Sequence, residues 1–217
     1  MLPGSIQAVW TGTTEGDLGT GAVDNQLESR RRAVVDRPWS FLRQGHGPDV
    51  FVVSQPGEGV GHTGDALVSA HSGACLAVFT ADCAPLALAS PEGVMGAAHA
   101  GWRGLSCGVI ERAVATMQEL GATRIQAALG PCIHAECYEF SVEELENLAS
   151  RLGPSVASCT SSGTPALDIP AAVRSAVETA GAELVWSDPA CTACSGSHFS
   201  FRARRNSERQ ALVMWRA

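Results

Sequence analysis

The segment PLALASPEGVMGAAHAGWRG, residues 85–104, is the stretch from which the fold can be predicted. Two apolar runs, 85–90 and 94–100, flank SPEG, whose Pro and Gly favour a tight turn, so the segment predicts a β-hairpin of buried strands. The second strand ends at His99 and is followed at once by Gly101, Trp102 and Arg103. Such residues at a strand end indicate either a functional site or a corner of the core.

Strand and helix patterns extend on both sides of this hairpin. The apolar stripe from Leu105 to Leu120 predicts a helix that Gly104 opens and Gly121 ends. Further helices are expected over 23–35, 141–152 and 168–181, the last two with Ser141 and Asp168 as N-caps. Further strands are expected over 6–12, 40–44, 49–54, 65–70, 74–81, 125–130, 183–188 and 210–217, and an exposed loop over 153–166. Without a repeat or a linker, this alternation predicts one α/β domain over residues 1–217, with a mixed sheet.

The composition excludes several classes of protein. The 217 residues are 45% hydrophobic and 17% charged, as in a globular chain, and the net charge of -7 argues against nucleic-acid and membrane-surface binding. Every basic residue is arginine, which excludes Schiff-base chemistry, a Walker-type phosphate loop and a lysine base. We see no signal peptide or membrane-spanning run, and therefore expect a cytoplasmic protein with eight reduced cysteines.

Two cysteine-containing segments have ambiguous spacing. CTAC, residues 191–194, is a single CxxC that Ser195 and Gly196 follow, whereas a thioredoxin-type pair opens a helix. The cysteines, His134 and Glu136 of GPCIHAECYEF, residues 130–140, could ligate a metal or form a turn and the start of a strand. Neither HExxH nor a paired CxxC occurs, so the spacing alone indicates no standard zinc module.

Three other residues lie at strand ends or in a glycine-flanked loop, where a side chain can be held in place and still face a cleft. Cys83 and His99 follow apolar runs that we expect to end side by side, and His46 lies between two glycines in RQGHGPDV. Two histidines and a cysteine can hold zinc and leave a fourth position open. The same residues suit a Cys83 thiolate nucleophile with His99 as its base. In the alternative interpretation Cys83 is a small buried residue and His99 a hydrogen-bonded turn residue.

Arginines and one tryptophan provide candidate substrate contacts. Trp102 could form a flat wall for a ring, and Arg103 a forked donor for phosphate or carboxylate, although both residue types also occur in cores and at strand ends. Arg202, Arg204 and Arg205 form a basic cluster in SHFSFRARR, which could contact a phosphate or lie on a solvated edge.

These motifs together resemble a known family. TADCAPLAL followed by GAAHAGWRGLSCGVIE, then ALGPCI with CYEF, the terminal HFSFRARR and RQGHGPDV are similar to the YfiH or laccase-domain family, also called multicopper polyphenol oxidase-like. The resemblance covers nearly all of residues 38–217, and the spacing from TADC to HAGWRG is its most specific part. The first forty residues match only weakly.

The resemblance implies a layered α/β sandwich similar to the cysteine-hydrolase domain of cytotoxic necrotizing factor toxins. It implies a catalytic zinc bound by His46, Cys83 and His99. The implied activities are phosphorolysis of adenosine, inosine, guanosine and methylthioadenosine, and deamination of adenosine, with purine nucleosides and phosphate as partners. Arg103 and Arg202 would then orient phosphate beside Trp102. Copper-dependent polyphenol oxidation is the older assignment of the family, and peptidoglycan-precursor editing has been attached to some bacterial members.

The chain departs from the family pattern in two places. His134 and Ala135 replace a glycine-proline pair, and Ala203 replaces the second of two arginines, for which Arg204 is a candidate substitute. Asp82 is either a proton shuttle beside Cys83 or a buried structural acid. Two alternatives compete with this function: a metal-free Cys83–His99 hydrolase and a non-catalytic ligand-binding module.

Overall fold

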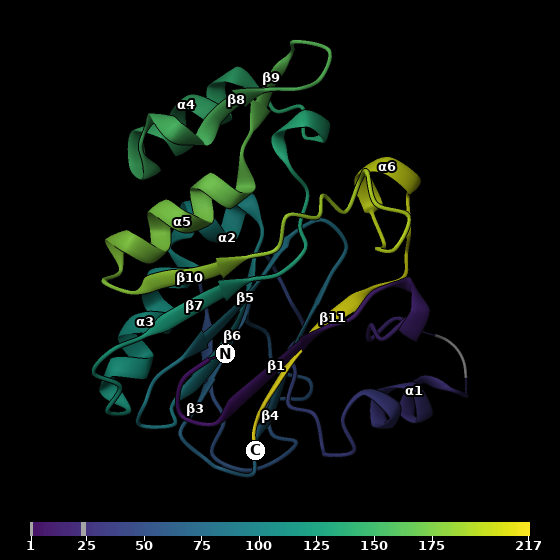
Figure 1. Cartoon of the computed structure of the whole chain (residues 1–217), viewed down its shortest axis with the longest axis vertical. Helices are drawn as coiled ribbons and strands as arrows, with labels where there is room; N and C mark the ends of the chain where they lie inside the picture. Colours follow the sequence, from purple (N-terminus) through teal and green to yellow (C-terminus); the bar gives the residue numbers. More distant parts are fainter. Residues whose placement is uncertain (1, 23–24) are drawn as a thin grey trace.

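The protein has two packed β-sheets with helices on the outer faces, as seen in the computed structural model (Figure 1). The structure describes residues 2–22 and 25–217. Within them the larger sheet has six strands in the order β10, β7, β5, β6, β3, β2. These strands are β10 (Glu183–Ser187), β7 (Gln126–Leu129), β5 (Ala84–Ala89), β6 (Met95–Ala100), β3 (Ala66–Ser69) and β2 (Val50–Val52). The pairs β10–β7 and β2–β3 are parallel and the others antiparallel, so the expected mixed sheet is confirmed.

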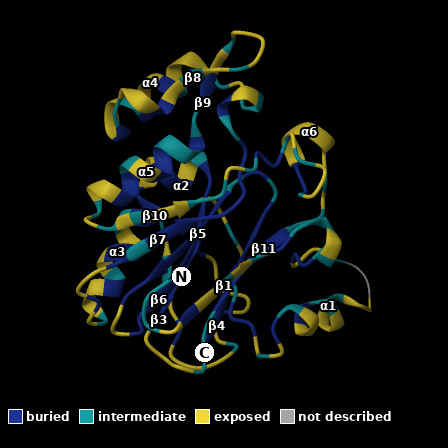
Figure 2. Cartoon of the chain, in the orientation of Figure 1, coloured by how far each residue is buried: buried dark blue, intermediate teal, exposed yellow. Residues whose placement is uncertain are grey.

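The smaller sheet has the order β1, β11, β4, and all its pairs are antiparallel. Its strands are β1 (Ile6–Trp10), β11 (Gln210–Arg216) and β4 (Cys75–Thr80). Side chains alternate between the faces of a strand. Leu76 and Val78, on one face of β4, therefore pack against Ala87 and Met95 of the larger sheet. Phe79, on the opposite face of β4, packs in a separate cluster with Trp39. The core is thus divided into layers, and buried strands lie between exposed helical surfaces (Figure 2).

Helices cover the other face of the larger sheet. Leu86 and Leu88 of β5 pack there against Ile110 and Val173, in the largest apolar cluster of the described residues. The helices are α1 (Leu27–Val34), α2 (Trp102–Cys107), α3 (Val109–Glu119), α4 (Val142–Leu152), α5 (Ile169–Thr179) and α6 (Phe201–Arg204). Short 3-10 turns occur at Thr13–Glu15, Ala135–Cys137 and Pro154–Val156. No helix among the described residues combines the length and the apolar character needed to cross a membrane.

The predicted hairpin and both N-caps are confirmed, but four local predictions were wrong. The helix expected over 105–120 starts earlier, with Gly101 as its N-cap in place of Gly104, and divides at Gly108, whose φ of 83° a residue with a Cβ rarely adopts. Residues 40–44 form isolated bridges instead of a strand, because Ser40 and Arg43 each pair with one residue only. The expected loop 153–166 contains the antiparallel pair β8 (Ala157–Cys159) and β9 (Pro165–Leu167). The helix expected over 23–35 spans Leu27–Val34, and residues 23–24 lie outside the described part.

Candidate active site and metal centre

Cys83 and His99 lie side by side, although not for the reason expected from the sequence. β4, the run before Cys83, belongs to the smaller sheet, whereas His99 is in β6 of the larger one. The chain crosses between the sheets at residues 81–83, where Asp82 has a φ of 96°. Cys83 then directly precedes β5, and β5 pairs with β6 so that Pro85 lies opposite His99. The register of the hairpin therefore positions Cys83.

His46 is positioned by a buried carboxylate that the sequence did not reveal. Asp65, only 1% exposed, accepts the backbone amides of Gly45, His46 and Gly47 at 3.1, 2.9 and 2.7 Å. This arrangement holds His46 at a φ of 62°, in the left-handed region. The same carboxylate lies 2.8 Å from Nδ1 of His99, so one side chain orients both histidines. The only sequence signal for Asp65 is an acid directly before the apolar run 66–68.

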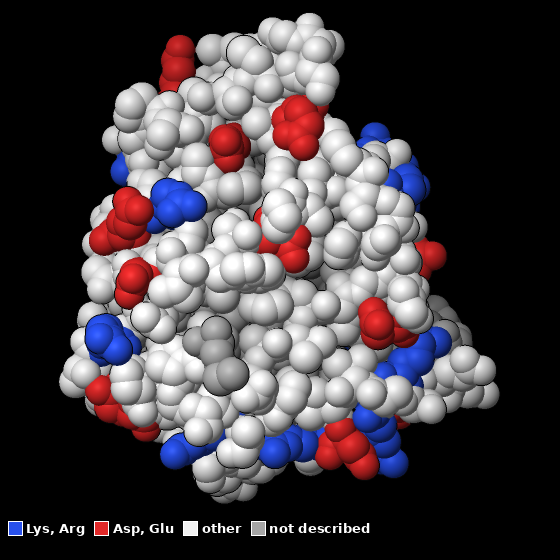
Figure 3. Space-filling model, viewed as in Figure 1, with Lys and Arg blue, Asp and Glu red and all other residues white. Residues whose placement is uncertain are grey.

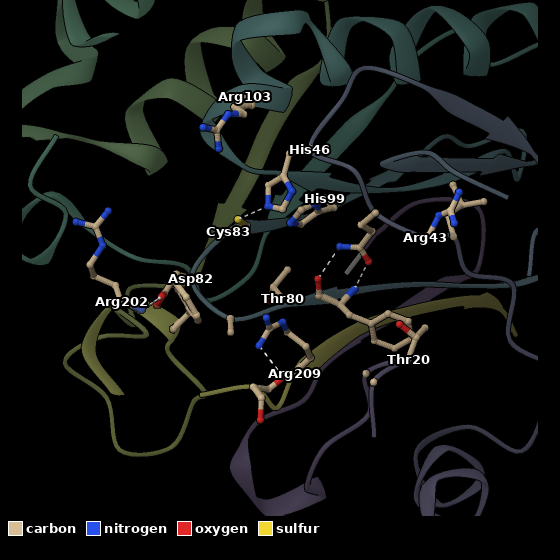
Figure 4. A pocket seen from close by; sticks show the side chains of 18 of the residues that line it. Thr20, Arg43, His46, Thr80, Asp82, Cys83, His99, Arg103, Arg202 and Arg209 are labelled. Atoms are coloured by element: carbon tan, nitrogen blue, oxygen red, sulfur yellow. Dashed lines mark hydrogen bonds between the residues drawn. The ribbon is translucent and has the colours of Figure 1, made fainter. Parts of the chain in front are cut away.

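The three side chains face one another in the pocket shown in Figure 4. Their candidate ligand atoms all lie within 4.8 Å of each other, and Sγ of Cys83 is 3.9 Å from Nε2 of His46. The two imidazole rings meet edge to face, with centroids 4.8 Å apart. A Cβ at Gly101 would lie 3.0 Å from both Sγ of Cys83 and Cδ2 of His46, so this glycine leaves room for them.

This set of donors fits a transition metal such as zinc. Zinc bonds of about 2.0–2.3 Å place tetrahedral ligands roughly 3.3–3.8 Å apart, which small side-chain movements would achieve here. Asp65 occupies Nδ1 of His99 and leaves Nε2 for the site, the usual orientation of a histidine ligand. Three protein ligands leave a fourth position for substrate or water, as in catalytic sites.

The side chains also polarise each other strongly in the absence of a metal. Burial would raise the pKa of the Cys83 thiol, but His99 and His46 outweigh it and lower that pKa to about 6. Burial would lower the pKa of His99, but the Cys83 thiolate and the Asp65 carboxylate raise it to about 9. The metal-free pair is therefore a thiolate and an imidazolium at neutral pH.

The cluster opens into a cavity of about 600 Å³ that is rich in arginine. Arg103 stacks over Trp102 at 4.3 Å, and Arg202 stacks over Tyr138 at 4.6 Å. Arg43 and Arg209 also line the cavity, and Asp82 is the one acid among its described lining residues (Figure 4). On the face shown in Figure 3, by contrast, basic side chains lie mostly toward the edges and acidic ones also occur near the centre. The positive charge of the cavity suits an anionic ligand.

Two expectations about neighbouring residues need revision. Arg204 does not face the cavity, because its guanidinium donates to the carbonyls of Thr192, Ala193, Ser195 and His198. It is a structural residue and no substitute for the missing arginine. Of the two interpretations of Asp82, the structure favours the buried structural acid. Its oxygens accept the Thr192 hydroxyl and the Arg202 backbone amide, each at 2.7 Å.

Several contributors to the cavity, among them Arg43, Tyr138 and Arg209, were missed from the sequence. Arg43 is three residues from His46 in RQGHG, and Tyr138 lies in the CYEF motif, so both had a local signal. Arg209 had no local sequence signal, because the loop before β11 brings it to the cavity. Its guanidinium donates to the carbonyls of residues 206–208.

Comparisons with known proteins agree with this architecture. The family model described as multi-copper polyphenol oxidoreductase laccase matches residues 6–217. A purine nucleoside phosphorylase of Streptomyces coelicolor is 39% identical over 208 residues, covering 94% of this chain and 86% of that protein. A purine nucleoside phosphorylase of Deinococcus radiodurans is 40% identical over 178 residues, covering 80% of this chain and 67% of that protein.

Solved structures have the same fold. YlmD from Geobacillus stearothermophilus superposes with a TM-score of 0.86 at 28% identity, covering 98% of this chain and 92% of that one. A Bacillus licheniformis protein called YfiH gives the same TM-score at 20% identity, over 98% of this chain and 93% of that one, which is a likeness of fold alone. The resemblance seen in the sequence motifs is thus confirmed. The chain belongs to the multi-copper polyphenol oxidoreductase laccase family and is a homologue of proteins named purine nucleoside phosphorylase.

Proposed function

We propose that this chain is a zinc-dependent purine nucleoside phosphorylase that acts on adenosine, inosine, guanosine and methylthioadenosine, and that it also deaminates adenosine. The observation that carries the proposal is the arginine-lined cavity, which opens directly onto His46, Cys83 and His99. Relatives named purine nucleoside phosphorylase, at 39–41% identity over most of the chain, support the same activity. In this proposal those three residues are both the metal ligands and the catalytic centre.

The arginines of the cavity would bind phosphate. Arg103 and Arg202 are each stacked on an aromatic ring, which limits their motion and leaves a planar fork for a phosphate oxygen pair. Nη1 of Arg202 also donates to the Glu139 carbonyl at 3.1 Å, which further fixes its position. Two prepositioned guanidinium groups would hold phosphate near the ribose and lower the entropic part of the barrier.

Aromatic side chains between these arginines would bind the purine. Trp102, Tyr138 and Phe201 line the same cavity, and the cavity volume accommodates a nucleoside with phosphate. In phosphorolysis a phosphate oxygen bonds to C1 of the ribose while the glycosidic bond breaks. The purine nitrogen keeps the bonding pair and takes the proton that phosphate gives up. A zinc ion at the cluster would supply Lewis-acid polarisation of a bound oxygen or nitrogen atom.

Deamination needs a different balance of atoms. Water adds its oxygen to the purine carbon that carries the amino group, and ammonia leaves with the displaced nitrogen. Both oxygens of Asp82 accept hydrogen bonds from the protein, so Asp82 is better suited to fixing the crossing at residues 81–83 than to moving this proton.

A metal-free cysteine hydrolase is the second candidate, because Cys83, His99 and Asp65 also have the connectivity of a catalytic triad. His99 lies between the Cys83 thiol and Asp65, with the Nδ1–Oδ1 distance at 2.8 Å. A thiolate with a lowered pKa would attack an amide, and the imidazolium would protonate its leaving nitrogen. Peptidoglycan precursors are one amide class to test.

A substrate screen with metal analysis separates these functions. The protein is incubated with each nucleoside, with and without phosphate, and the products are identified by mass spectrometry. We expect a sugar 1-phosphate only with phosphate: ribose 1-phosphate from adenosine, inosine and guanosine, and 5-methylthioribose 1-phosphate from methylthioadenosine. We also expect about one zinc at the His46 cluster. Cys83→Ala should lose both the product and this zinc, and the exposed control Cys159→Ser should keep them. Chelator-resistant amide hydrolysis without phosphorolysis would favour the hydrolase. Bound copper with phenol oxidation would favour the older assignment.

A further inference from the structure

We propose that Cys137, Cys191, Cys194 and Glu136 form a second zinc site, separate from the His46 cluster, which holds one wall of the cavity in place. Their candidate ligand atoms all lie within 4.8 Å of one another. Sγ of Cys137 is 3.2 Å from Sγ of Cys194, which in turn is 3.9 Å from Oε1 of Glu136. Three thiols and a carboxylate converge here from segments more than fifty residues apart in sequence.

The backbone prepares these groups for a metal. Cys132 and Cys191 pair in an isolated parallel bridge, which aligns the 130–140 segment with the CTAC segment. CTAC forms a turn in which the Ser195 amide donates to the Cys191 carbonyl at 2.9 Å. Sγ of Cys191 accepts the His134 amide at 3.4 Å, and the amides of Ala193 and Cys194 also point to it. Burial raises the pKa of the Cys191 thiol more than these amides lower it, so the thiolate would form as the sulfur binds a cation.

The donor set favours zinc. Three thiolates select soft or borderline metals, and here the fold, not the sequence spacing, brings the third cysteine to the Cys-x-x-Cys pair. Each thiol would lose its proton to solvent as its sulfur bonds to Zn²⁺, with no change of oxidation state. No oxidant is therefore required, whereas a Cys137–Cys194 disulfide would need one. Glu136 completes four ligands, and Nδ1 of His134, 3.9 Å from Oε1 of Glu136, is placed to pair with that carboxylate.

The site would act on the cavity through structure and not through chemistry. Four protein ligands leave no open position, as in structural zinc sites. Cys137 directly precedes Tyr138, on which Arg202 stacks. Thr192, next to Cys191, donates its hydroxyl to Asp82, and Asp82 also accepts the Arg202 amide. A metal here would thus fix both segments that position Arg202.

Zinc counting by mass spectrometry of purified protein tests the proposal. We expect two zinc ions per chain in the wild type and one in Cys83→Ala, which keeps the second site. We expect one in Cys194→Ser and none in the double variant. Cys159→Ser and Cys107→Ser, which remove exposed cysteines outside both clusters, should keep two. Because each site has its own variant, failure of the His46 site and failure of this one give different counts.

X-ray absorption at the zinc edge provides a test that does not depend on the folding of Cys194→Ser. In Cys83→Ala the remaining zinc should show three sulfur neighbours at about 2.3 Å. One zinc in the wild type that Cys83→Ala abolishes would overturn the proposal, as would a shell of nitrogen and oxygen alone. A Cys137–Cys194 disulfide would also overturn it, detected as two thiols that stay unreactive to alkylation in denatured, chelated protein until reductant is added.

Discussion

Replacing Asp65 by asparagine should weaken both the fold and the candidate metal centre. Each oxygen of the carboxylate accepts two donors: Oδ1 the His46 amide and His99, Oδ2 the Gly45 and Gly47 amides. Asparagine has nearly the same shape but offers one oxygen and one NH₂ group. Whichever way the asparagine amide is turned, its NH₂ group replaces one carboxylate oxygen and faces the two donors that this oxygen accepted.

The expected loss follows from these two hydrogen bonds. A hydrogen bond to a charged group contributes about 1.5–3 kcal/mol, so two of them give about 3–6 kcal/mol. For 217 residues the unfolding entropy is about 0.46 kcal/mol/K, so the melting temperature should fall by about 7–13 °C. Zinc affinity should fall about 10–100-fold, because Asp65 orients His99 and holds the His46 loop.

Stability also supplies a pH test. Burial would raise the pKa of Asp65, but His99 and the backbone amides hold it below its ordinary value. The stabilisation is therefore fully present above about pH 4, the pKa of Asp in the unfolded chain, and is lost as pH falls through the lower folded pKa. The free-energy gap between wild type and Asp65→Asn should be largest near neutral pH and shrink in acid.

Denaturant unfolding of metal-free protein and zinc competition with a chelator measure these effects separately. Asp49→Asn is the matched control, because Asp49 is exposed. If Asp65→Asn unfolds at the same denaturant concentration as wild type and binds zinc as tightly, the carboxylate does not organise the site.

Three further results follow from the same geometry. Gly101→Ala should reduce zinc affinity at least 10-fold, because its Cβ would lie 3.0 Å from Cys83 Sγ and His46 Cδ2; unchanged affinity in a chelator titration would contradict this. In chelated protein, alkylation of Cys83 should accelerate as pH rises through about 6, since the thiolate is the reactive form; a midpoint above pH 8 in peptide mass spectrometry would refute it. Arg103→Ala should raise KM for phosphate about 10-fold or more, because it removes a guanidinium from the cavity. The control Arg124→Ala, at an exposed arginine, should leave this KM unchanged. Equal KM values for the two variants would argue against an anion contact at Arg103.

Local patterns predicted much of the fold, and pairings over long distances account for what was missed. The hairpin 85–100 and the helix capped by Ser141 depend on neighbours within a few residues, so periodicity and capping found them. The isolated bridge between Cys132 and Cys191 cannot be read from either segment, because it depends on how strands distant in sequence align. For that reason the sequence presented GPCIHAECYEF and CTAC as two weak signals, whereas the structure makes them one cluster.

The candidate active site shows why its parts could be recognised but its assembly could not. His46 and Asp82 both have positive φ without being glycine, a conformation that costs about 1–3 kcal/mol each and is found preferentially at functional sites. In both cases a buried carboxylate holds the strained segment. Asp65 takes the amides around His46, and Asp82 binds Thr192 and the Arg202 amide, 110 and 120 residues away. The contacts that hold each strained residue therefore come from a distant segment. For that reason the sequence motifs identify candidate metal ligands such as Cys83, whereas the carboxylates that position these ligands become evident only in the folded chain.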